Sequence, residues 1–240
     1  MDTDIGARQR SRAPHPRYRI RLAQPNEIDV VLGLIDHAAG WLRAEKNTTQ
    51  WARPWPSPDD RWKRVYEALL DQETWLLFHE ERAIGTVSIK LIGHEELWTQ
   101  RERDVEAVYL HRLVIHRDFA GGGLGAELID WAGRKGASRQ RNTELIRIDV
   151  WTDNDELHAY YRRQGFKDVA VRTTSNGTPS GALFEKPLPP PIRALPARIY
   201  EPRAGAREPG CMIRPTRIIA GPKSAGPKSP VPQAAATSRS

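Results

Sequence analysis

The sequence predicts an α/β (α+β) domain between residues 18 and 188, with a mixed central sheet flanked by helices. Short segments with strand-like alternation of apolar residues alternate with longer segments whose apolar residues follow helical spacing. The order of these segments is β α α β β β α β α β β, which requires at least one right-handed crossover between strands. The chain of 240 residues is long enough to bury one core of ordinary size.

The strands are predicted from short apolar runs bounded by turn residues. These runs are residues 18–22, 74–80, 83–91, 107–115, 145–151, 166–172 and 182–186. The second and third runs are expected to form a hairpin, because only a short charged turn separates them. The charged residues 92–105 are expected to form a loop.

Four helices are predicted from apolar residues at helical spacing. The first follows Asn26, a residue that can cap a helix, and the second follows Ser57, with a proline at its first position, and runs to about Leu70. The third covers residues 124–136. The fourth is capped by Asp153 or Asn154 and runs to about Gln164, followed by a glycine suited to a left-handed C-terminal cap.

Both ends of the chain are expected to be disordered, over residues 1–17 and 189–240. The second segment holds 11 of the 19 prolines, and its nine basic and two acidic residues account for the whole net charge of +7. Because residues 1–188 are neutral in sum, the charge gives little support to a nucleic-acid-binding domain, and the basic tail is expected to aid solubility.

Several function classes are disfavoured by composition. The only cysteine is Cys211, so neither an intrachain disulfide nor a cysteine-based zinc site is possible. No apolar run approaches the roughly 18 residues that span a bilayer, and the first residues lack the apolar region of a secretory signal. A cytoplasmic protein without membrane partners is expected.

The most informative segment is the strand 107–115, the loop 116–123 and the helix that follows. Glycines in the loop and at the start of the helix, together with unpaired first-turn amides, predict a socket for phosphate groups. A flexible connector is the simpler interpretation. The pattern does not match a P-loop, and its match to G-x-G-x-x-G/A is weak because five residues separate the strand from the first glycine.

At these residues the sequence resembles the GNAT superfamily of N-acetyltransferases. Its acetyl-CoA motif Q/R-x-x-G-x-G/A corresponds to residues 120–125, with Ala120 in place of Gln or Arg. Its later motif N-x-x-x-x-x-L-Y-x-x-x-G-F corresponds to residues 154–166, with Tyr160 in place of Leu. The resemblance covers about 18–188 and implies a GNAT-like acyl-CoA N-acyltransferase fold with a mostly antiparallel sheet.

The resemblance implies a set of residues that bind acetyl-CoA, a co-substrate in a reaction without metal. Main-chain groups of three strand residues would bond to pantetheine, the glycine loop would hold the pyrophosphate, and an asparagine would contact the pantetheine arm. In this sequence they are Leu113, Val114 and Ile115, then Gly121, Gly122, Gly123, Leu124, Gly125 and Ala126, then Asn154. Arg117 is placed to meet a CoA phosphate or to be an ordinary surface charge.

The implied reaction is direct attack of an amine on the thioester, without a covalent enzyme intermediate. Tyr161 is the candidate acid that protonates the departing thiolate, with core packing as its simpler role. The base that receives the amine proton is open between His111, Glu106 and a chain of waters.

The acceptor is expected to be a small-molecule or peptide amine. The cluster Trp41, Trp51, Trp55 and Trp62 could form its pocket, with Arg53 nearby, or could be a small core under a long loop. A homodimer is possible, and a nucleic-acid partner is not expected. Two other functions stay open at this point, a dinucleotide-binding oxidoreductase and a non-catalytic protein that binds CoA or nucleic acid.

Overall fold

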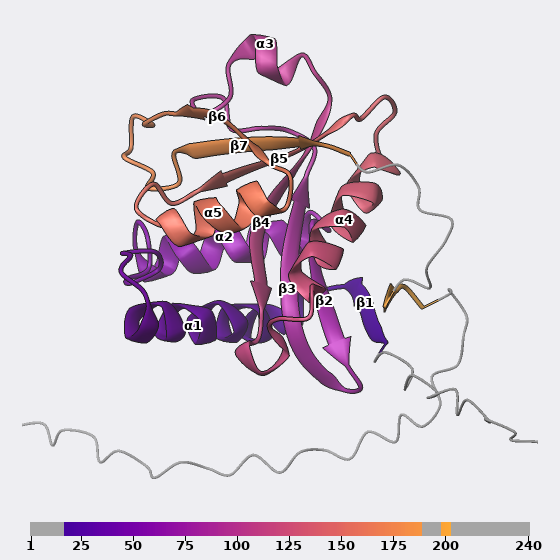
Figure 1. The fold of residues 1–240 in the computed structure, drawn as a ribbon. Coiled ribbons are helices and arrows are strands. Elements are labelled where there is room, and N and C mark those ends of the chain that lie inside the picture. The colour runs from indigo at the N-terminus through magenta and orange to yellow at the C-terminus, as the bar shows by residue number, and fades with distance from the viewer. Residues whose placement is uncertain (1–16, 189–197, 203–240) are drawn as a thin grey trace, which may run out of the picture. The chain divides into compact units, whose positions relative to one another are not determined.

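The computed structural model describes residues 17–188 and 198–202 (Figure 1). Most of the two segments expected to be disordered, and Cys211, lie outside these residues. No helix in the described part is long and apolar enough to cross a membrane.

One eight-stranded sheet, in the order β6-β7-β5-β4-β3-β2-β1-β8, forms the centre of the described domain (Figure 1). Five pairings are antiparallel, and β4/β5 and β1/β8 are parallel, so the predicted mixed and mostly antiparallel sheet is confirmed. The strands are β1 Tyr18–Leu22, β2 Thr74–His79, β3 Arg82–Lys90, β4 Ala107–Ile115, β5 Leu145–Val150, β6 Lys167–Val171, β7 Ala182–Pro187 and β8 Ile199–Tyr200.

Helices cover both faces of the sheet. Helices α1 (Ile28–Glu45) and α2 (Pro58–Leu70) bury their apolar sides against β2 and Val114 on one face. Helices α4 (Leu124–Ala137) and α5 (Asp155–Arg163) belong to the core on the other face, together with residues of β1 to β5, β7 and β8. Figure 1 shows α4 beside the strands, away from α1 and α2.

The starts of α2 and α5 have side-chain caps at predicted residues, whereas the start of α1 differs from the prediction. Ser57 caps α2 by accepting from the amide of Asp60 at 3.1 Å, as predicted. Asn26 instead lies in a short 3-10 turn before α1. Asn154, not Asp153, caps α5, because the Asp153 carboxylate accepts hydrogen bonds from Thr49 and its neighbour Thr48.

The predicted loop at 92–105 contains a helical turn, α3 (Gln100–Arg103). Thr99 and Glu102 form a capping box, and Arg172 forms a two-pronged ion pair with Glu102, which lowers the pKa of that carboxyl to about 2. The high charge of the segment therefore reflects ion pairing to the β6–β7 side of the domain rather than an unstructured loop.

The strands β4 and β5 separate after three residue pairs, of which the last is Tyr109 with Arg147. Beyond that point β4 pairs only with β3. The register of this pairing shifts between Thr86 and Ser88, because two steps along β3 face three steps along β4, which forms a bulge in β4. Arg112 lies in this bulge with φ 50°. One edge of β4 therefore faces an opening in the sheet.

A short piece of the segment expected to be disordered returns to the sheet, which corrects the predicted boundary at residue 188. Ile199 is buried in the main core and pairs in parallel with Tyr18. Arg198 forms an ion pair with Glu127 on α4 at 2.6 Å. A strand of two residues is too short to show an alternation of apolar and polar residues, so it could not be predicted within a segment of this composition.

Candidate active site

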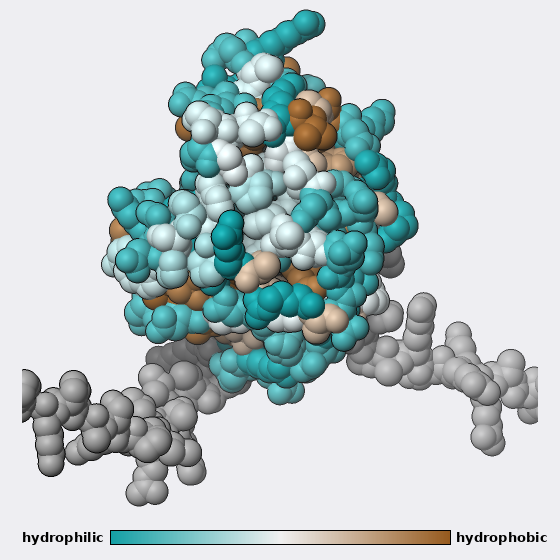
Figure 2. Space-filling model, turned by 90° about the vertical axis from the view of Figure 1, so that its left-hand side faces the viewer, coloured by the Kyte–Doolittle hydropathy of each residue, from teal (hydrophilic) through white to brown (hydrophobic). Residues whose placement is uncertain are grey.

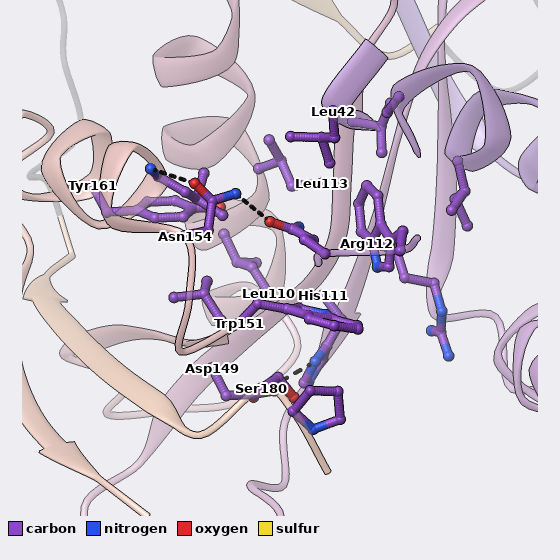
Figure 3. A pocket seen from close by; sticks show the side chains of 18 of the residues that line it. Leu42, Leu110, His111, Arg112, Leu113, Asp149, Trp151, Asn154, Tyr161 and Ser180 are labelled. Atoms are coloured by element: carbon purple, nitrogen blue, oxygen red, sulfur yellow. Dashed lines mark hydrogen bonds and ion pairs between the residues drawn. The ribbon is translucent and has the colours of Figure 1, made fainter. Parts of the chain in front are cut away.

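A cavity of about 1310 Å³ extends from the glycine loop, along the open edge of β4, to the connection between α1 and α2. Figure 2 shows the face that carries this connection, where residues of near-neutral hydropathy occupy the middle and hydrophilic residues surround them. The close view in Figure 3 shows His111 and Arg112 from β4, Asp149 from β5, and Tyr161 from α5 around one space.

The glycine loop, where the sequence predicts a phosphate socket, lies at one end of the cavity. Gly121, Gly122 and Gly123 have φ values of 94°, 52° and 80°, a left-handed run that other residues adopt only with strain. Within the described residues, no hydrogen bond engages the amides of Gly122, Gly123, Gly125 or Ala126. These amides and the N-terminus of α4 fit a diphosphate.

Two loop residues predicted to bind the coenzyme lie behind the socket. The Leu124 side chain is buried in the main core. Gly122 does not line the cavity, and its carbonyl accepts a hydrogen bond from Arg198 Nη2 at 2.7 Å. Gly125 lines the cavity, and a Cβ there would meet the Tyr160 hydroxyl at 2.6 Å, so this glycine permits close packing of α4 on α5.

The predicted pantetheine strand lies where the sheet opens. Leu113, Val114 and Ile115 all line the cavity, and β5 pairs with β4 only before Leu110. An extended chain can therefore reach the main-chain groups on this edge of β4.

Asn154 lines the cavity, but its side chain already has partners. Its oxygen accepts from the amide of Leu157 at 3.0 Å, and its nitrogen donates to Gln50 at 2.5 Å. The side chain therefore caps α5 and ties it to the connection between α1 and α2. The predicted contact with pantetheine stays a prediction.

Tyr161 is buried at the wall of the cavity, with its ring packed against Phe166 and Tyr160. No hydrogen bond to its hydroxyl is present in the described part of the chain. Burial raises the pKa of this phenol, so the hydroxyl remains protonated at neutral pH. A protonated and unpaired hydroxyl facing the cavity is free to donate to a ligand.

His111 faces Asp149 across the opening between β4 and β5, with Nδ1 3.7 Å from Oδ1 (Figure 3). Burial lowers the pKa of His111, against the opposing effect of the carboxylate, so the imidazole is neutral at neutral pH. Glu106, the other candidate base, precedes β4 and does not line the cavity.

The predicted aromatic pocket is present in part. Trp41, Trp51 and Trp55 line the cavity. Trp62 stacks on Tyr66 instead and is 44% exposed. Arg117 packs its guanidinium over the Trp41 ring at 3.8 Å, and both line the cavity.

The comparisons with known proteins agree with this geometry. The model of the acetyltransferase (GNAT) family matches residues 30–166, more than half of the chain. The chain belongs to the GNAT family. An uncharacterised N-acetyltransferase of Bacillus subtilis (strain 168), YesJ, is 30% identical over 168 residues, which are 68% of this chain and 86% of YesJ.

Solved structures of GNAT proteins have the same fold. An acetyltransferase of the GNAT family from Listeria monocytogenes 4b F2365 aligns with a TM-score of 0.55 at 21% identity, over 71% of this chain and 95% of its own. The PaiA N-acetyltransferase of Thermoplasma acidophilum, solved with coenzyme A, aligns with a TM-score of 0.52 at 16% identity, over 71% and 98%. The aminoglycoside acetyltransferase AAC(6')-Ib, solved with coenzyme A and kanamycin, aligns with a TM-score of 0.51 at 19% identity, over 71% and 94%.

Three residues of this GNAT site did not emerge from the sequence. Asp149 carries no motif of its own, although continuing the parallel register from Tyr109 and Arg147 places it opposite His111. Gln50 and Arg198 carry no local signal, because each acts on a segment far away in the chain. No cluster of metal-binding side chains occurs among residues 17–188 and 198–202.

Proposed function

We propose that this GNAT protein transfers an acetyl group from acetyl-CoA to the nitrogen of an amine, by direct attack in a ternary complex. The observation that carries the proposal is the left-handed glycine run 121–123, which leaves the free amides of Gly123, Gly125 and Ala126 at one end of the cavity that Tyr161 and His111 also line. Structural neighbours that bind coenzyme A, and one that also binds kanamycin, support the donor and the amine acceptor as classes.

The main chain would hold the coenzyme. The amides of Gly123, Gly125 and Ala126 are the groups for the pyrophosphate, and the open edge of β4 at Leu113 and Ile115 is the surface for pantetheine. The coenzyme supplies an acetyl thioester, whose carbon forms a bond to the amine nitrogen while its bond to sulfur breaks. Neutral main-chain donors suit this task because they are fixed before the ligand arrives.

Tyr161 would act on the departing sulfur. Its hydroxyl is protonated and has no partner among the described residues, so it can donate a hydrogen bond as negative charge develops on sulfur. A phenol is a weaker acid than a thiol, and burial weakens this one further, so the hydroxyl would stabilise the thiolate by donating a hydrogen bond while the proton stays on oxygen. Burial beside Phe166 fixes the ring for that contact.

His111 would receive the proton that the attacking amine loses. Its lowered pKa keeps the imidazole neutral and able to accept a proton at neutral pH. Asp149 faces Nδ1, orients the ring and stabilises the imidazolium once it forms.

The proposal is tested by titrating the full chain with acetyl-CoA and with NADPH, and by following thiol release with a panel of amines. We expect the chain to bind acetyl-CoA with micromolar affinity and not to bind NADPH. Tyr161→Phe is expected to lower kcat by about 100-fold, because donation to sulfur is lost, while acetyl-CoA affinity stays close to that of the native chain. Full turnover by the variant would remove Tyr161 from the mechanism, and absence of acetyl-CoA binding would overturn the function.

A further inference from the structure

Two guanidinium groups line the cavity on the side of α2 and the β4 bulge. Arg112 comes from the bulge and is partly buried, whereas Arg64 comes from α2. Arg112 donates to the hydroxyl of Ser88 at 3.4 Å and to the carbonyl of Arg64 at 3.2 Å. The Arg64 guanidinium bonds to the carbonyl of Trp55 and lies 4.9 Å from its ring centre.

Neither guanidinium has a carboxylate within 4.0 Å among the residues that the structure describes. Two other cations that line the same cavity are paired, since Arg61 contacts Asp36 at 2.7 Å and Lys46 contacts Glu156 at 2.6 Å. The unpaired cations of the described lining also include Arg53, Arg117 and Arg163, which are exposed, so Arg112 differs from them by its partial burial.

Two carboxylates act on Arg112 through their charge without contacting it, Glu73 and Asp149. Glu73 contacts Lys90 at 3.1 Å, and Asp149 faces His111 at 3.7 Å. Burial, followed by repulsion from Arg64, lowers the pKa of Arg112 to about 10. A partly buried cation in this position gains from any anion that enters the cavity.

The neighbouring residue in the chain faces the reacting groups. His111 immediately precedes Arg112, and the bulge allows both side chains to line the cavity, although adjacent residues of a regular strand point to opposite faces (Figure 3). His111, the group proposed to receive the amine proton, is thus adjacent to Arg112, the group that can bind an anion. The planar guanidinium matches the two oxygens of a carboxylate, and the negative charges of Glu73 and Asp149 near Arg112 favour an anion of single charge.

We propose that the acceptor is a small amine that also carries a carboxylate, of the amino acid type, with its carboxylate bound by Arg112 and Arg64 and its amine directed to His111. This proposal rests on the proposed acetyltransferase function. It is more specific, because that function requires only an amine.

The test compares three matched acceptors for each of the twenty standard amino acids: the amino acid, its amide and, where available, its decarboxylated amine. The full chain is saturated with acetyl-CoA and thiol release is followed. We expect kcat/KM to favour the amino acid by at least about tenfold, the effect of one charge-assisted contact. The amide is the stringent control, because its less basic amine is more often neutral and would react faster without carboxylate binding.

Variants link the preference to the guanidinium groups. Arg112→Ala is expected to bring the amino acid and its amide to nearly equal kcat/KM while the amide is still acetylated, and Arg112→Lys is expected to restore part of the preference. Arg64→Ala is expected to have a smaller effect in the same direction, because this residue is exposed. Arg61→Ala, which removes a paired arginine of the same wall, is expected to leave the ratio unchanged.

Each outcome decides one of the two proposals. Equal or better use of the amides or decarboxylated amines, or a preference that survives Arg112→Ala, overturns the carboxylate site. Binding of acetyl-CoA without acetylation of any amino acid also overturns it and leaves the acetyltransferase function in place. Failure to bind acetyl-CoA overturns the function itself.

Discussion

The two ends of the cavity are lined by different kinds of groups, main-chain amides at one end and side chains at the other. At the end proposed for the coenzyme, main-chain amides of the loop that includes Gly121 and Gly123 form the wall, and their positions follow from local backbone geometry. At the other end, side chains such as Trp55, Arg64 and Arg112 form the wall, and they come from separate elements. We infer that the coenzyme end is fixed by a few neighbouring residues, whereas the acceptor end depends on the whole fold.

The strongest test of this contrast is a side chain in the glycine loop. Gly123→Ala is expected to weaken acetyl-CoA binding by about 10- to 100-fold, because a Cβ strains the left-handed residue and occupies the open space before the helix. The affinity is measured by titration calorimetry.

The matched control is Gly177→Ala. Gly177 is also left-handed, with φ 68° and no atom within 4 Å of the position that a Cβ would take, but it lies on the connection between β6 and β7. Both variants are expected to lose about 1–2 kcal/mol of stability, and only Gly123→Ala to lose coenzyme affinity. Equal losses of affinity would show that general strain, not the socket, is responsible.

A weaker effect is expected from a side chain of the acceptor half. Asp149→Asn is expected to lower kcat/KM about tenfold, because the imidazole of His111 loses its orienting carboxylate. The negative charge of Asp149 raises the pKa of His111, so its removal lowers that pKa further. The acid side of the pH profile, where activity falls as His111 gains a proton, is therefore expected to move to lower pH.

A movement of this limb to higher pH in Asp149→Asn, or an unchanged profile, would contradict the pairing. The measurement is kcat/KM over the range from pH 5 to pH 9 (a span around the usual histidine pKa, about 6.5). Binding of acetyl-CoA serves as the control and is expected to stay unchanged, because Asp149 lies outside the glycine loop.

The smallest effect is expected at Arg198, which contacts the coenzyme end from behind. Arg198→Ala removes the hydrogen bond to the Gly122 carbonyl and the ion pair with Glu127. The KM for acetyl-CoA is expected to rise about threefold, as for the loss of one hydrogen bond, with kcat unchanged. Lys135→Ala, which breaks the pair with Glu201 in the same segment but touches no loop residue, is expected to leave this KM unchanged.

A drop in kcat for Arg198→Ala without a change in KM would place its role outside coenzyme binding. An equal rise of the KM for acetyl-CoA in Lys135→Ala would also show that the contact of Arg198 with the glycine loop is not the cause.

The contrast between the two ends also explains what the sequence could predict. The glycine loop and Tyr161 belong to short motifs in which spacing along the chain determines the geometry, and Gly121, Gly123 and Tyr161 line the same cavity. The pairing of His111 with Asp149 depends on the register between β4 and β5, which is set by contacts across the sheet. Glu106 is equally available in the sequence, but the opening between these strands begins beyond it.

The acceptor end was predicted only as a composition of aromatic and charged residues. Trp62 and Trp55 are seven positions apart, but only Trp55 lines the cavity. Arg112 faces the cavity together with His111 because of a single extra residue in β4, and no periodicity indicates such a bulge.

The pairing of β8 with β1 has a consequence for the solubility of shortened chains. β1 bonds to β2 along one side, and β8 covers part of its other side at Tyr18 and Arg19. A chain that ends at residue 188 would leave that side without its partner, and a bare edge strand is a template for pairing with another molecule. We therefore expect such a truncated chain to self-associate, even though it retains every residue of the two GNAT motifs.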